Sequence, residues 1–223
     1  MAILCRDLKM LFVLTPATGS TALSRVLCSD FGGVWLPEKS GGPVRRKHST
    51  LTELLEAGLL SSQERDGLCV VTSVRNPYDR LVSIYYKRRG VTSEALANPD
   101  FWMNRLNAAK ASADLRLAQN NTFPEWIRHR FIRSWLPRRL RGRALSAYDQ
   151  YVDGADVVLR YERLQEDFDD VLVRLGAAPA EIPQFNVSKA RPRRDYQKEY
   201  TTLSRAMAGF GQRLDLNRFG YEF

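Results

Sequence analysis

The 223-residue sequence has few cysteines and few histidines, three and two respectively. Cys5, Cys28 and Cys69 are odd in number, widely spaced and surrounded by apolar residues, which argues against a disulfide framework and against a zinc site. No spacing of His, Cys and carboxylate residues is typical of a metal site, so we expect no metal cofactor. The cysteine usage favours a reducing, cytoplasmic location.

Long apolar runs are also missing. The run at residues 10–14 ends at Thr15 and Pro16 and is too short for the hydrophobic segment of a signal peptide. No other stretch approaches the length of about 20 residues that a membrane-spanning helix needs. We therefore expect neither classical export nor a transmembrane segment.

The composition is that of a folded protein with excess positive charge. Hydrophobic residues make up 44% and charged residues 26% of the sequence, a globular profile whose length fits a single domain over residues 1–223. Lys and Arg number 34 against 25 Asp and Glu, a net charge of +9. Such an excess favours an anionic partner, which leaves open a nucleic acid, a polyanionic glycan, an anionic membrane or a phosphorylated cofactor.

Strand-like and helix-like segments alternate along the chain. Apolar runs bounded by turn residues predict buried strands at residues 10–14, 69–74 and 157–160. Capping signals and helical spacing predict helices at residues 50–58, 164–175 and 201–210, and a helical insertion at about 91–147. The segments 32–46 and 177–199 are rich in basic residues with Pro or Gly, typical of surface loops. The alternation predicts an α/β fold with a parallel sheet and helices on both faces.

The first strand leads into a short polar loop, Pro16-Ala17-Thr18-Gly19-Ser20-Thr21, followed by apolar residues at helical spacing. Amides and hydroxyls at such a helix N-terminus suit an anion. The loop resembles a phosphate-binding loop but lacks the Gly-Lys-Ser/Thr end of an NTPase P-loop, which argues against a kinase or an ATPase. By itself such a turn can also simply begin a helix.

The second strand ends in a longer motif, Val74-Arg75-Asn76-Pro77-Tyr78-Asp79-Arg80-Leu81-Val82-Ser83-Ile84-Tyr85. In this motif Asn76 as an N-cap and Pro77 in the first turn predict the start of a helix. Together with the Pro-x-x-Gly-Ser-Thr loop, this motif resembles the superfamily of sulfotransferases that use 3′-phosphoadenosine-5′-phosphosulfate (PAPS). The resemblance implies a P-loop-NTPase-like α/β fold. It also implies transfer of a sulfuryl group to a hydroxyl acceptor, with 3′-phosphoadenosine-5′-phosphate (PAP) as the other product.

The resemblance assigns roles to individual residues. It implies that the first loop binds the 5′-phosphosulfate through Thr18, Gly19, Ser20, Thr21 and Ala22. It implies that the 3′-phosphate is bound by Arg75 and Ser83. A guanidinium offers phosphate a forked cationic donor, and a hydroxyl about two helical turns further on can lie on the same side. The alternative is that Arg75 and Arg80 only cap and solvate a helix.

Three further segments are similar to carbohydrate-type members of the family. They are Lys47-His48-Ser49-Thr50, Leu159-Arg160-Tyr161-Glu162-Arg163-Leu164 and the C-terminal run from Asp215 to Tyr221. One position departs from the family, because Ala17 stands where a Lys or Arg usually contacts the phosphosulfate. Either another cation replaces it, with Arg25, Arg45, Arg46 and Lys47 as candidates, or the enzyme is slow or degenerate.

The transfer needs a base that takes the proton of the acceptor hydroxyl. His48 is the first candidate, because imidazole titrates near neutrality, and Glu38 is the second. A solvated residue just outside a helix is the alternative interpretation of His48, and a surface role is expected for His129. Tyr161, Tyr196 and Tyr200 could stack on adenine, although tyrosines more often belong to a core or a rim.

The acceptor is expected to be a carbohydrate, a glycolipid or a small natural product. The basic stretch at residues 128–143 can bind an acidic acceptor or simply keep a helix solvated. A second hypothesis is a PAP-binding module that lost turnover with Ala17. A third, a nucleic-acid-binding protein, rests on charge alone and lacks a recognition motif, so no nucleic acid is expected as partner.

Overall fold

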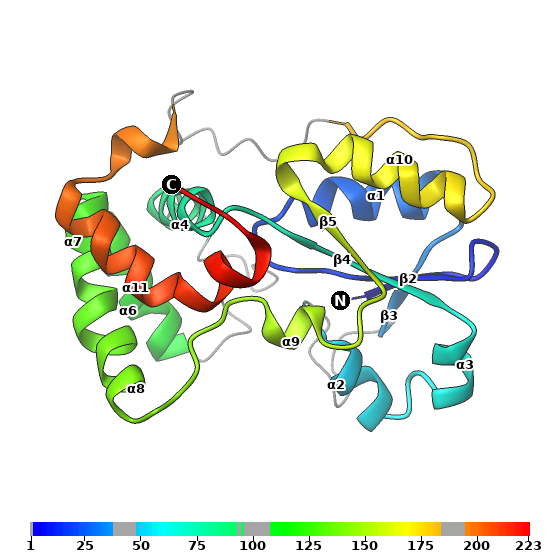
Figure 1. Cartoon of the computed structure of the whole chain (residues 1–223), viewed down its shortest axis with the longest axis horizontal. Coiled ribbons are helices and arrows are strands. Elements are labelled where there is room, and N and C mark those ends of the chain that lie inside the picture. The colour runs from blue at the N-terminus through cyan, green and yellow to red at the C-terminus, as the bar shows by residue number, and fades with distance from the viewer. Residues whose placement is uncertain (1, 38–47, 93–94, 96–107, 184–194) are drawn as a thin grey trace. The chain divides into compact units, whose positions relative to one another are not determined.

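The computed structural model describes residues 2–37, 48–92, 95, 108–183 and 195–223. The chain divides into two compact units, shown in Figure 1. Unit 1 comprises Met1–Arg75 and Ala147–Asn186, and unit 2 comprises Asn76–Ser146 and Val187–Phe223. The organisation of residues 1–223 as a single domain stays a prediction.

Unit 1 is a mixed α/β unit with a five-stranded sheet in the order β3-β1-β2-β4-β5. The strands are β1 (Ala2–Cys5), β2 (Met10–Val13), β3 (Val34–Leu36), β4 (Cys69–Val74) and β5 (Val157–Arg160). The helices are α1 (Ser20–Asp30), α2 (Leu51–Glu56), α3 (Ser62–Asp66), α9 (Asp149–Val152) and α10 (Leu164–Arg174), with a 3₁₀ turn η2 (Tyr161–Arg163) before α10.

The three strands expected from the sequence are confirmed, and β2, β4 and β5 are parallel to one another. The expectation of a purely parallel sheet was wrong at one edge, where β1 runs antiparallel to both β2 and β3. A four-residue turn joins β1 to β2, with the Lys9 amide donating to the Arg6 carbonyl at 3.0 Å. Such a tight connection forces antiparallel pairing, whereas a parallel pair needs a long crossover.

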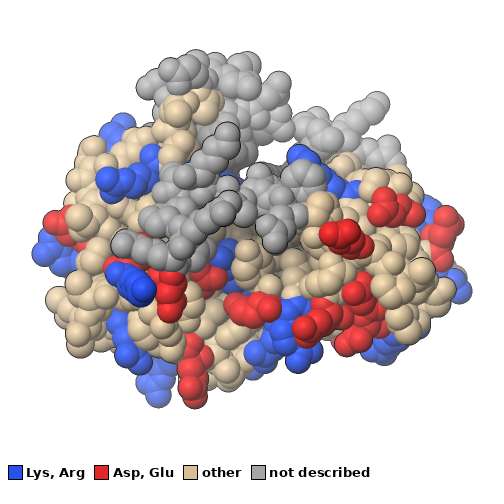
Figure 2. Space-filling model, turned by 90° about the horizontal axis from the view of Figure 1, so that it is seen from above, with Lys and Arg blue, Asp and Glu red and all other residues tan. Residues whose placement is uncertain are grey.

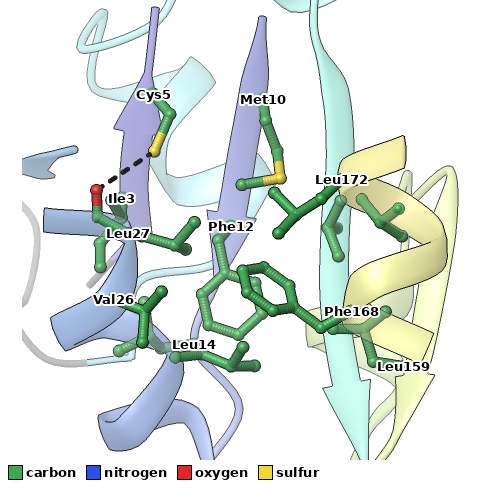
Figure 3. Packing of buried hydrophobic residues seen from close by; sticks show 13 residues of the cluster. Ile3, Cys5, Met10, Phe12, Leu14, Val26, Leu27, Leu159, Phe168 and Leu172 are labelled. Carbon is green, nitrogen blue, oxygen red and sulfur yellow. Dashed lines mark hydrogen bonds between the residues drawn. The ribbon is translucent and has the colours of Figure 1, made fainter. Parts of the chain in front are cut away.

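Both faces of the sheet are covered. On one face, α1 and α10 pack their apolar side chains against inward-facing residues such as Phe12 and Met10, as Figure 3 shows. On the other face, Leu51 and Leu54 of α2 and Tyr151 of α9 pack against Leu11 and Val13. Burial on two sides explains why β2 is a continuous apolar run, and why the neighbouring Val70 and Val71 of β4 are both buried, in the clusters on opposite faces.

Unit 2 is helical. Its elements are α4 (Pro77–Arg89), α6 (Ala108–Asn120), α7 (Phe123–Arg130), a π-helical turn η1 (Phe131–Trp135), α8 (Leu136–Leu140), a 3₁₀ turn η3 (Tyr196–Glu199) and α11 (Thr202–Phe219). The N-terminus of α4 follows the sequence prediction, because the Asn76 side chain accepts a hydrogen bond from the Tyr78 amide and Pro77 is the first helical residue. The helices between residues 108 and 140 lie in the stretch that was expected to be helical.

The last helix ends nine residues later than expected, since α11 ends at Phe219 and the prediction ended at Phe210. Gly211 sits inside the helix because it faces a ring at very close range. A Cβ added there would lie 2.3 Å from Cδ2 of Trp135. The helix instead ends at Gly220, which adopts a left-handed conformation with φ of 62°. The close packing against Trp135, and not a helix end, therefore explains the glycine at position 211.

Charges of both signs share the surface. On the face drawn in Figure 2, Lys and Arg side chains lie interspersed with Asp and Glu side chains. The described part of that face therefore does not form one continuous basic surface. No helix among the described residues is long and apolar enough to cross a membrane.

Candidate anion-binding site at the first strand–helix loop

The loop between β2 and α1 is a tight turn with two left-handed residues. Ala17 has φ of 66° and Gly19 has φ of 79°. The position of Gly19 also leaves little room, since an added Cβ would lie 2.7 Å from Cδ2 of Leu164 and 3.1 Å from Cδ2 of Tyr161. The sequence therefore needs glycine at this position for both conformation and space.

Gly19→Ala is expected to lower the free energy of unfolding by about 2 kcal/mol, combining left-handed strain with a forced shift of Leu164 and Tyr161. Gly58→Ala is the matched control, because Gly58 has a φ of 64° but an added Cβ meets no described atom within 4 Å. The control should cost about 1 kcal/mol from conformation alone. Urea unfolding of both variants measures the difference, and equal losses would show that the close approach at Gly19 has no energetic weight.

Buried hydroxyls hold the loop in shape. The Thr18 hydroxyl donates to the Thr15 carbonyl at 2.9 Å and lies 2.7 Å from the Ser73 hydroxyl of β4. The Ser20 hydroxyl donates to the same Thr15 carbonyl at 3.0 Å. Each hydroxyl has one proton to donate, so these two donors are used inside the loop. Thr18 and Ser20 thus shape the loop, and Ser73 is a supporting residue that the sequence alone did not indicate.

The backbone at the start of α1 is the part of the loop that suits an anion. The first hydrogen bond of the helix runs from the Ala22 amide to the Gly19 carbonyl at 2.9 Å. The amides of Ser20 and Thr21 precede it, where a helix offers its amides no acceptor of its own. Among the described residues no side chain caps α1, and its first turn carries no acidic residue. The helix dipole adds positive potential at this end.

A buried arginine lies beside this loop. Arg75 follows β4, is only 5% exposed, and donates from Nη1 to the Ala17 carbonyl at 3.3 Å. Its backbone is fixed by Tyr148, whose hydroxyl donates to the Arg75 carbonyl at 2.6 Å. The Arg75 guanidinium carbon lies 3.9 Å from the ring centroid of Tyr161, a cation–π contact. One face of Tyr161 is therefore turned to Arg75, a contact that the hypothesis of adenine stacking did not include.

His48 lies at the strand end of the same loop. Its Nδ1 is 2.9 Å from the carbonyl oxygen of Leu14, the residue that follows β2. A carbonyl can only accept, so Nδ1 carries the proton and donates. In the neutral ring the other nitrogen, Nε2, is then the atom that can take up a proton. Thr50, two residues later, caps α2 through a capping box with Glu53, as the sequence predicted. The structure thus brings the loop, Arg75 and His48 together in unit 1.

The motifs that build this site extend over the whole chain. The model of the Sulfotransferase family matches residues 1–222. The chain belongs to the sulfotransferase family. No curated protein and no solved structure matches it.

Not every predicted residue of this sulfotransferase belongs to the described part of unit 1. Ser83 is half-buried on α4 in unit 2. Arg25, a candidate replacement for the missing loop cation, is exposed on α1. The remaining candidates lie outside the described residues; these are Glu38, Arg45, Arg46 and Lys47.

Two of the three candidate adenine-stacking tyrosines belong to an aromatic cluster of unit 2. The Tyr200 ring meets Phe123 and Phe223 edge to face at centroid distances of 4.7 and 5.3 Å. Its hydroxyl donates to the Tyr78 carbonyl at 2.9 Å, and burial raises the pKa of this hydroxyl well above its usual value. Tyr196 accepts a hydrogen bond from the Asn76 side chain at 3.3 Å. Core packing accounts for the position of Tyr200.

The cysteines are free thiols, and burial raises the pKa of Cys5 to about 12. No group of three or more His, Cys, Asp or Glu residues in the described part of the chain could hold a metal ion.

A cavity of about 380 Å³ lies between β5 and α10, where it is lined by residues such as Val158, Arg163 and Arg174. None of the predicted site residues lines this cavity.

Proposed function

We propose that this sulfotransferase moves a sulfuryl group from PAPS to a hydroxyl acceptor, releasing a sulfate ester and PAP. The observation that carries the proposal is the placement of the buried Arg75 guanidinium against the Ala17 carbonyl, next to the uncapped start of α1. A cation and helix amides at one place suit a ligand with several anionic groups. PAPS has such groups at both its 5′ and its 3′ positions.

Two parts of the donor are assigned to two parts of the protein. The amides at Gly19, Ser20 and Thr21 are proposed to hold the 5′-phosphosulfate, because they lie at the positive end of α1. Arg75 is proposed to bind the 3′-phosphate with its forked donors, and the family motif assigns Ser83 to the same phosphate. Tyr161 supports this role by holding the Arg75 guanidinium against its ring.

His48 is proposed as the base. As the acceptor oxygen attacks sulfur, Nε2 of His48 takes the hydroxyl proton, and the bond from sulfur to the bridging phosphate oxygen breaks. The electron pair of that bond stays with the phosphate of PAP, whose new charge the loop amides stabilise. The Leu14 carbonyl keeps the Nδ1 proton in place and so keeps Nε2 as the basic atom. Glu38 stays the second candidate for this role.

The proposed acceptor is a carbohydrate, a glycolipid or a small natural product. The most basic segment, residues 128–143, belongs to unit 2 and carries exposed arginines such as Arg133, Arg138 and Arg141. A positive segment of this kind favours acidic acceptors. A cytoplasmic location also stays a prediction, which rests on the cysteine usage.

The test of the function is a transfer assay with ³⁵S-labelled PAPS and a panel of neutral and acidic sugars, glycolipids and phenols. Label that appears in one acceptor class, together with PAP, is the expected result. PAP binding without transfer to any acceptor would instead support the second candidate, a binding module that lost turnover. A folded protein that neither binds PAP nor transfers label would contradict both.

Ala17 is the observation that favours the second candidate, since the loop carries no cation at this position. Ala17→Lys is expected to raise kcat about tenfold or more, because a cation aimed at the developing phosphate charge lowers the barrier. Ala17 already has a left-handed φ of 66°, so the lysine adds little new backbone strain. Ala17→Gln is the control for side-chain size, and an equal gain in both variants would rule out a charge effect.

A further inference from the structure

Unit 2 contains two arginines that share one carboxylate. Arg88 of α4 donates from Nη2 to Oδ2 of Asp114 on α6 at 2.8 Å. Arg130, the last residue of α7, reaches both oxygens of Asp114 from Nη1, each at 3.4 Å. Trp126 of α7 also donates to Oδ1 of Asp114, at 3.3 Å. A single carboxylate thus serves three donor groups, and three of its four contacts, at 3.3–3.4 Å, are long.

The arginines are largely buried and not fully paired. Their side chains are 23% and 28% exposed, for Arg88 and Arg130 respectively. Within the described structure, Nη1 of Arg88 and Nε of Arg130 are buried without a hydrogen-bond partner. Buried charged donors without acceptors are costly. Among the described side chains in contact here, two positive charges face the single negative charge of Asp114, so a balanced arrangement needs a further anion.

Among the described residues, the aromatic neighbours of Arg130 do not supply that anion. The Arg130 guanidinium lies over the rings of Trp126 and Trp135, at 4.7 and 5.7 Å from their centroids. Ring faces attract a cation but carry no net charge. Burial and the charge of Arg130 lower the pKa of Arg88 to about 10, with a further lowering from Arg80. Burial also lowers the pKa of Arg130. In both arginines burial is the main cause of the lower pKa, and the opposing effect of Asp114 does not offset it.

We propose that Arg88 and Arg130 form a binding site for an oxyanion, a sulfate or carboxylate group. Guanidinium donors match the oxygen pairs of such groups in a forked geometry. A bound oxyanion would supply the second negative charge and acceptors for the arginine N–H groups, while Asp114 keeps its contact with Arg88. The site uses no residue assigned to PAPS, and the inference does not rest on the proposed function.

The site is tested with inorganic sulfate at constant ionic strength. The titration is made on the full chain carrying Arg75→Ala, which removes the cation beside the α1 loop. Because the amides of that loop remain, only the part of the signal that Arg130→Gln removes is assigned to this site. Fluorescence of Trp126 and Trp135, next to Arg130, reports binding, and thermal unfolding gives a second readout. A saturable change is expected, and Arg130→Gln should weaken it at least about tenfold. The exposed Arg128 on the same helix provides the control, Arg128→Gln, which should bind sulfate unchanged.

A second variant keeps the test decisive if Arg130→Gln does not fold. Asp114→Asn leaves both arginines but removes the competing carboxylate, so sulfate affinity should rise about tenfold. The oxyanion can be a free ion or a group on a larger ligand, and titration with a monosaccharide sulfate distinguishes the two. If it binds with the same affinity as inorganic sulfate, the site takes the free ion. If it binds more tightly, the site takes a sulfate group carried on a larger ligand. The proposal is overturned if sulfate gives no saturable change, or if binding is indifferent to both Arg130→Gln and Asp114→Asn.

Discussion

Replacing His48 with alanine is expected to lower kcat for sulfuryl transfer by about 10²–10⁴-fold, while the affinity for PAP stays unchanged. The reason is the geometry of the ring. Nδ1 donates to the Leu14 carbonyl at 2.9 Å, so Nε2 is the basic atom of the neutral imidazole. Removal of the ring removes the base but leaves Arg75 and the start of α1 in place. Rates with labelled PAPS and calorimetric titration with PAP measure the two quantities separately.

The chain offers a matched control for this variant, because His129 is its only other histidine. His129 lies on α7 in unit 2, and His129→Ala should leave kcat unchanged. Glu38→Gln separates the two candidate bases. A large loss of kcat with Glu38→Gln, together with a small loss with His48→Ala, would show that the base has been wrongly assigned.

Arg75→Ala should weaken PAP binding about 100-fold, because charge-assisted hydrogen bonds to phosphate are worth about 1.5–3 kcal/mol. Adenosine 5′-monophosphate lacks the 3′-phosphate, and its affinity should change far less. Arg75→Lys keeps the charge but loses the fork, so an intermediate affinity is expected. Calorimetric titrations of the three proteins with both nucleotides give the comparison.

Arg75 also has structural contacts, which the experiment must separate from binding. The side chain donates to the Ala17 carbonyl and packs on Tyr161, so each variant is first compared with the wild type by thermal unfolding. Tyr161→Leu removes the ring and keeps the arginine. If both nucleotides lose the same affinity in Arg75→Ala, the role of Arg75 would be to shape the loop and not to bind the 3′-phosphate.

Much of unit 1 could be predicted from the sequence because its signals are local. The strand at residues 69–74 is mostly apolar and buried. The Asn76-Pro77 pair that follows it begins α4 of unit 2, as a cap and a first-turn proline do. Two strands, β1 and β3, were missed, and for β3 the reason is physical. β3 is three residues long and lies in a segment rich in Gly and Pro, and only its pairing with β1 makes it a strand.

The candidate site was predicted less completely than the fold. The sequence motifs, through their resemblance to the family, predicted that the loop and Arg75 belong to the site. They did not give the contact of Arg75 with Tyr161, because the two residues are 86 positions apart and meet only through the pairing of β4 with β5. The internal use of the Thr18 and Ser20 hydroxyls was also invisible in the sequence. Residue types thus indicated an anion site. Only the structure showed which groups are available to bind the anion and which hold the loop in shape.

The most direct test of the account is calorimetric titration of the wild-type protein with PAP. The account predicts one PAP per chain with a dissociation constant in the micromolar range, and much weaker binding of adenosine 5′-monophosphate. A folded wild-type protein that takes up no PAP would contradict the assignment of the α1 loop and Arg75 as the site of the sulfuryl donor.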